Sequence, residues 1–110
     1  MPGDEELRNL VQSIIDLHDT QDFAQLSSLV SKSEIEAGTW FTKERFYEVC
    51  SVIENEIGRN TSLAYIGSLN RKSSTLTLWR TTYTRSDDEI LWQIIFDNES
   101  HKIKLMHVNW

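Results

Sequence analysis

The histidines and the carboxylates near them are the residues of this sequence best suited to acid–base chemistry. His18 stands among Asp16, Asp19 and Asp22, and His107 falls in a strand-like segment. A carboxylate that is desolvated in an apolar pocket has a raised pKa and can exchange protons near neutral pH. Aspartates beside helix ends and turns, however, usually bind the backbone. Acid–base catalysis is therefore an alternative that needs a histidine and a carboxylate or tyrosine in one pocket.

Nucleophilic and metal chemistry find little support in the residue types and spacings. Cys50 is the only cysteine, and it falls in the apolar stripe of a predicted helix, where a thiol is normally buried and inert. The three histidines show no spacing that brings two of them to one metal ion, and Gly67 is isolated, so there is no glycine-rich phosphate loop. We therefore predict no catalytic residues, no metal site and no cofactor.

Aromatic residues favour ligand binding over catalysis. The chain has four tryptophans, three tyrosines and four phenylalanines. The candidate ligand-binding residues lie in segments with strand-like alternation, and they are Tyr65, Trp79, Tyr83, Trp92 and His107. A cavity lined by them would suit a small apolar ligand, with indole N–H and phenolic O–H groups fixing its orientation. The alternative is that these rings pack into a solid core or a dimer interface and leave no open volume.

The first half of the chain predicts three helices. Apolar residues recur at helical spacing from Leu7 to His18, with Asp4 as the expected N-cap, and a shorter helix follows from Phe23. Residues 31–39 have no clean period and predict a loop. The third helix, up to residue 57, has the clearest apolar stripe.

The ends of this third helix carry specific signals. Thr42 can cap it, and Phe41 and Phe46 occupy the two positions of a hydrophobic staple. Gly58 supplies the residue at which such helices end. Arg45 stands where the glutamate or glutamine of a capping box would reach back, so the reciprocal half of that motif is absent.

After residue 58 the apolar period changes to two, which predicts strands. Four strands are expected within residues 63–69, 75–85, 90–96 and 102–110, and the short polar turns between them imply an antiparallel meander. The predicted fold class is α+β, with three N-terminal helices packed on one face of a curled, cone-like, four-stranded antiparallel meander. The length of 110 residues fits one domain spanning residues 1–110.

The third strand has apolar residues on both faces, which predicts a homodimer. Leu91 and Ile95 alternate with a second apolar set, and only Gln93 interrupts them on their face. The last strand is expected to place Ile103 and Leu105 on one face, opposite Met106 and Val108. Because helices cover only one face of the sheet, a second copy is expected to cover the other. A monomer whose loops and long side chains cover that face is the alternative.

Charge excludes one class of partner and leaves another open. The net charge of −6 argues against a protein that binds nucleic acid through a basic surface. Residues 1–56 hold 12 acids and 4 bases, whereas residues 57–86 hold no acid. The five bases of this second stretch are Arg59, Arg71, Lys72, Arg80 and Arg85. They could form a docking face for an acidic protein, or simply the solvated exterior of the strands.

The start of the chain and its longest apolar runs predict a cytoplasmic protein without a membrane partner. No apolar run approaches the ~18 residues of a membrane-spanning helix. The first six residues are acidic where a secretory signal needs basic ones. A signal peptide that had already been removed would leave no trace.

The order of elements and three short segments resemble the nuclear-transport-factor-like and cystatin-like α+β superfamily, and within it small bacterial domains of unknown function. The segments are residues 15–26, where an aspartate-containing break follows the first helix, residues 41–46 and residues 66–69. Thr20 and Gln21 replace the small residues expected at that break. The superfamily contains isomerases, dehydratases, transport factors and domains without known activity, so the resemblance implies the fold and selects no function.

The function predicted from the residues is that of a non-enzymatic, homodimeric binding or accessory module that holds a small apolar ligand in an aromatic-lined cavity. The alternatives are an acid–base enzyme of the isomerase or dehydratase kind in the same cavity, and a protein-interaction domain that uses the basic stretch.

Overall fold

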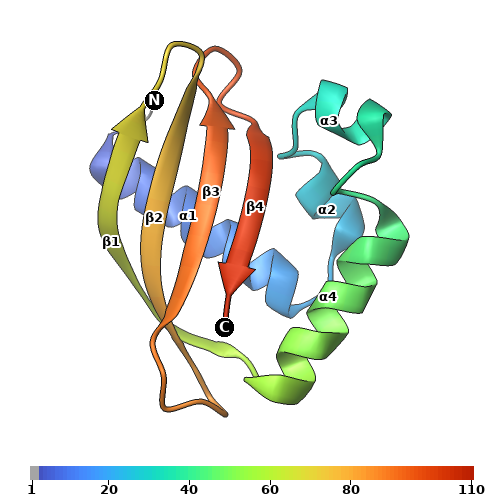
Figure 1. Cartoon of the computed structure of the whole chain (residues 1–110), viewed down its shortest axis with the longest axis vertical. Helices are drawn as coiled ribbons and strands as arrows, with labels where there is room; N and C mark the ends of the chain where they lie inside the picture. The colour runs from blue at the N-terminus through green and yellow to red at the C-terminus, as the bar shows by residue number, and fades with distance from the viewer. Residues whose placement is uncertain (1–2) are drawn as a thin grey trace.

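The computed structural model describes residues 3–110, and these form four helices and one sheet (Figure 1). The helices are α1 (Asp4–Asp19), α2 (Phe23–Ser27), α3 (Lys32–Ala37) and α4 (Lys43–Glu56). The strands are β1 (Asn60–Asn70), β2 (Ser74–Tyr83), β3 (Ile90–Asp97) and β4 (Ile103–Asn109). The predicted α+β class is confirmed. No helix in this part of the chain is both long and apolar enough to cross a bilayer.

The number of helices differs from the expectation of three, because α3 forms within the stretch predicted to be a loop. None of its side chains is buried, so it has no apolar stripe from which a period could be recognised. It ends at Gly38, whose φ of 61° is the left-handed conformation common after a helix. The N-cap of α1 also differs, since Gly3 occupies that position and Asp4 is the first helical residue.

The sheet is an antiparallel meander in the order β1-β2-β3-β4, with β1 and β4 at its edges. It is open, so the expected cone-like closure is not confirmed. Helix α1 crosses behind it and buries the stripe from Leu7 to His18 against it, whereas α2, α3 and α4 lie beyond the β4 edge (Figure 1). The uncovered face of the sheet is therefore the one toward the viewer.

The sheet has three register shifts among its described strands, and two of them, at Ile66 and at Lys104, decide which apolar side chains reach this uncovered face. Ile66 is an extra residue in β1, so Tyr65 pairs with Trp79 on the inner face while Gly67 pairs with an outer-face residue. Lys104 is an extra residue in β4, which places Ile103 on the inner face and Leu105 on the outer face. The expectation that Ile103 and Leu105 share a face is wrong, because simple alternation does not include a bulge.

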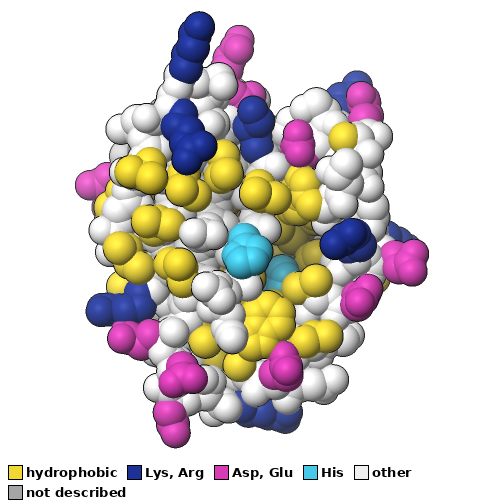
Figure 2. All heavy atoms as spheres, in the orientation of Figure 1, with side chains coloured by type: hydrophobic (Ala, Val, Ile, Leu, Met, Phe, Trp, Pro, Cys, Tyr) yellow, Lys and Arg dark blue, Asp and Glu magenta, His cyan; other side chains and the backbone are white. Residues whose placement is uncertain are grey.

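The uncovered face carries apolar side chains across all four strands, as Figure 2 shows. Cross-strand partners share a face, so burial and register together identify this set. It comprises Leu69, Leu76, Leu78, Leu91, Ile95 and Leu105. Leu69 is 54% exposed and Leu105 is 38% exposed. The expectation of apolar residues on both faces of the sheet is confirmed.

Candidate functional site

A cavity of about 370 Å³ lies between α4 and β4. In Figure 2 it is the hollow beside the sheet in which histidine side chains are surrounded by hydrophobic ones. Its lining is mostly aromatic and aliphatic: His18, Trp40, Phe41, Arg45, Phe46, Val49, Trp92, Leu105, Met106, His107, Val108 and Trp110. The cavity thus joins residues from both ends of the sequence at the open edge of the sheet.

Space remains beside β4 because the neighbouring helices pack mainly against one another and against α1. The segment after α2 pairs with β4 only at the first residue of that strand, through a bridge between Val30 and Ile103. Beyond this bridge α4 makes its close backbone contacts with α1 and α2. The rest of the β4 edge is therefore not covered by a helix, and the cavity lies alongside it.

Aromatic packing fixes the start of α4 at one end of the cavity. The Thr42 side chain accepts a hydrogen bond from the Arg45 backbone N–H at 3.2 Å, which confirms the expected cap. Phe41 and Phe46, the expected staple, lie 6.0 Å apart between ring centroids, and Phe23 of α2 stacks on Phe41 at 4.9 Å. Arg45 therefore projects from a helical turn whose backbone is held on both sides.

His18 is buried at the floor of the cavity, with 6% of its surface exposed. Its ring makes edge contacts with Phe46 at 5.5 Å and with Trp92 at 5.2 Å. Both ring nitrogens are 3.7 Å from the Cys50 sulfur. Burial lowers the pKa of His18 to about 4, so the ring is neutral near pH 7. Burial also raises the pKa of Cys50 to about 12, which keeps the thiol protonated and a poor nucleophile.

The three tryptophans of the cavity already donate their indole N–H groups to the protein. Trp92 donates to the Tyr83 hydroxyl at 2.8 Å, and Tyr83 is itself buried. Trp40 donates to Glu34 at 3.0 Å, and Trp110 donates to Glu56 at 2.6 Å. These bonds hold the rings in place. They also mean that indole donors do not supply the orienting contacts expected from the sequence.

The polar side chains that remain at the cavity are Arg45 and His107, and both are exposed at its rim. Among residues 3–110 no carboxylate and no tyrosine lines the cavity. The condition for acid–base catalysis, a histidine together with such a group in one pocket, is therefore not met there.

The aspartates around the end of α1 bind the backbone or a neighbouring side chain instead. Asp22 caps α2 by accepting from the Gln25 N–H at 3.0 Å, and Asp19 accepts from the Asn60 N–H at 3.0 Å. Burial raises the pKa of Asp19 above its usual value. Within the described residues no group of histidine, cysteine and acidic side chains is arranged to hold a metal ion.

The candidate ligand-binding residues divide between two hollows. Trp92 and His107 line the cavity, and Tyr83 lies behind Trp92. Tyr65 and Trp79, whose rings are 5.2 Å apart, line a second hollow of about 270 Å³ at the start of α1. The other residues of this second hollow are Asp4, Glu5, Leu7 and Arg8.

Several lining residues have no role in the sequence-based site, among them Trp40, Arg45, Met106 and Trp110. One of them carries a signal in the sequence. Arg45 replaces the acidic or amide residue of a capping box, and a position that departs from a local rule is a candidate for a role outside the local structure.

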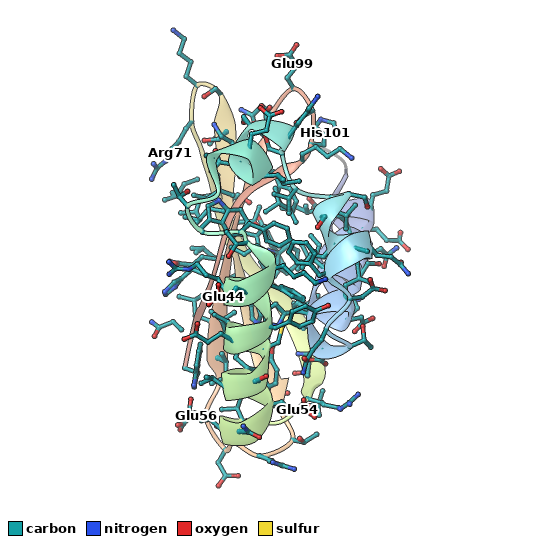
Figure 3. The ribbon with its side chains drawn as sticks, turned by 90° about the vertical axis from the view of Figure 1, so that its right-hand side faces the viewer. Glu44, Glu54, Glu56, Arg71, Glu99 and His101 are labelled. Carbon is teal, nitrogen blue, oxygen red and sulfur yellow. The ribbon has the colours of Figure 1, made fainter. Side chains whose placement is uncertain are left out.

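The basic stretch does not form one continuous surface. Arg71 lies in the β1–β2 turn at one end of the molecule, opposite Glu54 and Glu56 (Figure 3). Arg59 lies at that opposite end, 3.9 Å from Glu54. Between them Arg80 forms an ion pair with Glu89 at 3.1 Å. Such a distribution gives the protein-interaction alternative little support.

Comparison with known proteins finds no match to this chain among family models, curated proteins or solved structures.

Proposed function

We propose that the protein is a non-enzymatic binding module that holds a small, largely apolar molecule in the cavity between α4 and β4. The observation that carries this proposal is the cavity itself. Its volume of about 370 Å³ falls within the ~300–1,000 Å³ typical of small-molecule sites. Such sites combine apolar walls with a few polar groups that orient the ligand, and the lining here has that composition.

The anchored walls support a site that exists before the ligand arrives. Trp92 donates a hydrogen bond to Tyr83. Trp40 and Trp110 donate hydrogen bonds to glutamates of α3 and α4. A preformed site loses less free energy to the ordering of side chains when it binds. The bond from Trp110 to Glu56 also links the end of the chain after β4 to the end of α4, so it joins the two sides of the cavity there.

The proposal is tested with the neutral apolar dye N-phenyl-1-naphthylamine, whose fluorescence rises in apolar surroundings. We expect saturable binding at one site per chain. The variant Val49→Trp fills the cavity mouth and should abolish binding. Val52→Trp is the matched control, because Val52 lies on the same helix, is equally exposed at 40%, and does not line the cavity. Equal dye binding by both variants would contradict the proposed site.

We propose further that a second copy of the chain covers the apolar outer face of the sheet. Residues 3–56, which contain all four helices of the described chain, hold 12 of the 17 acids. The outer face holds apolar side chains together with Gln93 on β3, and His107 lies at its β4 edge. Two copies can therefore bring these faces together about a two-fold axis while most of their negative charge stays outside the interface.

Sedimentation equilibrium at micromolar concentration tests this dimer. Leu78→Lys places a charge in the middle of the face and should convert dimer to monomer. Ile35→Lys is the control, because Ile35 is exposed on α3, away from the sheet. A wild-type species of 12.9 kDa would contradict the dimer and leave the cavity proposal standing.

A further inference from the structure

The polar side chains that line the cavity share one chemical property, since each carries basic nitrogen. They are His18, Arg45 and His107. None of the acids among residues 3–110 lines the cavity, although the chain has 17 acidic residues and a net charge of −6. A lining with this bias disfavours cationic ligands and favours groups that accept hydrogen bonds or carry negative charge.

Arg45 is the permanent charge of the cavity. It lies in the first turn of α4, where the partial positive charge of the helix N-terminus disfavours a cation. The ion pairs within residues 3–110 join Arg59 to Glu54 and Arg80 to Glu89, so Arg45 has no carboxylate partner there. Local structure thus gives no reason for an arginine at this position.

Two side chains among the described lining residues can donate hydrogen bonds to a ligand at the mouth of the cavity. The indole N–H groups of Trp40, Trp92 and Trp110 are already bound to protein acceptors. His18 is buried and lies against the Cys50 sulfur. Arg45 and His107 remain at the rim, one projecting from α4 and the other from β4. A ligand with its polar end at the mouth of the cavity would lie between them.

We infer that the ligand is a small amphipathic carboxylate. Its apolar part lies against Trp92, Met106 and Val108, and its carboxylate is bound by the Arg45 guanidinium with His107 as a second donor. This inference rests on the proposed binding function and specifies the chemical class of its ligand. A guanidinium presents paired N–H donors that match the two oxygens of a carboxylate.

A monoanion fits the cavity better than a phosphate group. Sites for phosphate combine several donors, such as backbone N–H groups and more than one cation. Among residues 3–110, Arg45 is the one permanent cation that lines the cavity, which matches the single charge of a carboxylate. The apolar walls account for the rest of the ligand.

The inference is tested by calorimetry at pH 7.5 with three probes of equal chain length: octanoate, 1-octanol and octylammonium. We expect octanoate to bind most tightly and octylammonium most weakly. Arg45→Gln should weaken octanoate binding about ten- to a hundredfold, the effect of losing a hydrogen bond to a charged group, and leave octanol binding within about twofold. Arg71→Gln removes the same charge far from the cavity and should change neither value.

The conservative variant Arg45→Lys separates charge from geometry. It should keep the preference for octanoate over octylammonium with a lower affinity for octanoate, because an ammonium lacks the paired donors. Equal affinities for octanoate and octanol, or unchanged octanoate binding by Arg45→Gln, would overturn the carboxylate assignment while cavity binding stands. Failure of all three probes, together with the neutral dye, would overturn both proposals.

Discussion

The first turns of α1 and α4 border two hollows of similar aromatic character and carry opposite charge. The turn of α1 contains Asp4 and Glu5, which line the smaller hollow beside Tyr65 and Trp79. The turn of α4 contains Glu44 between the cations Lys43 and Arg45, and of these three residues Arg45 lines the larger cavity. Acidic residues at a helix N-terminus stabilise the helix, whereas basic ones do not.

The difference shows which feature distinguishes a ligand site from a groove. Aromatic side chains alone do not, because both hollows have them. The acids of α1 have a local explanation in the helix dipole, and its Arg8 donates to the Leu63 carbonyl at 3.3 Å. Arg45 has no such explanation. A polar group whose presence the local structure does not account for is therefore the better guide to function.

Neighbouring tryptophans line the two hollows, and replacing either of them with alanine gives the largest expected effects. Trp79 and Trp92 are cross-strand partners on β2 and β3, and both are buried. We expect Trp92→Ala and Trp79→Ala each to cost about 3–5 kcal/mol of stability, measured by urea unfolding. The N-phenyl-1-naphthylamine titration should separate them, with binding lost in Trp92→Ala and kept in folded Trp79→Ala. Loss of binding in both would mean that the hollows do not act separately.

Acid should destabilise the fold through His18, which contacts Trp92 at the floor of the cavity. The pKa of His18 is lowered from 6.5 to about 4 by burial, so the folded state favours the neutral ring. The stability that the neutral His18 ring contributes to the folded state is fully present above pH 6.5 and is lost as the pH falls from 6.5 toward 4. The expected loss between pH 7.5 and pH 5 is about 2 kcal/mol. Urea unfolding at the two pH values measures it.

Two variants identify His18 as the group responsible. His18→Leu should flatten the dependence on pH, whereas His107→Gln, which changes an exposed histidine, should leave it intact. Asp19 acts in the opposite direction, because burial raises its pKa and the folded state favours its protonated form. A wild-type slope that survives in His18→Leu would contradict the role of His18.

The sequence was sufficient to predict the helices and strands whose buried residues recur at a regular spacing. The helical stripe of α1 and the alternation in β2 and β3 follow from one face being buried in each case. Helix α3 has no buried side chain, and the bulges at Ile66 and Lys104 shift the register by one residue, so neither leaves a periodic signal. These features depend on tertiary packing that local pattern does not contain.

The candidate site could be predicted only in part, for a related reason. Trp92 and His107 are recognisable as aromatic or polar residues in strands, and the structure brings both to the cavity. Tyr65 and Trp79 have the same character and lie at the other hollow. The hollow that a strand residue faces depends on the places where the helices lie farther from the sheet. That distance is a property of the whole fold.

The smallest expected effect compares the two first turns directly. Arg45→Glu replaces an unfavourable cation with an acid at the N-terminus of α4, and it supplies the missing half of the capping box with Thr42. We expect a gain in stability of about 0.5 kcal/mol, visible as a raised urea midpoint, together with loss of octanoate binding. Glu5→Lys on α1 should lower stability by a similar amount and leave octanoate binding unchanged. A destabilised Arg45→Glu variant would instead show that Arg45 supports the fold through contacts of its own, and the contrast between the two turns would lose its functional meaning.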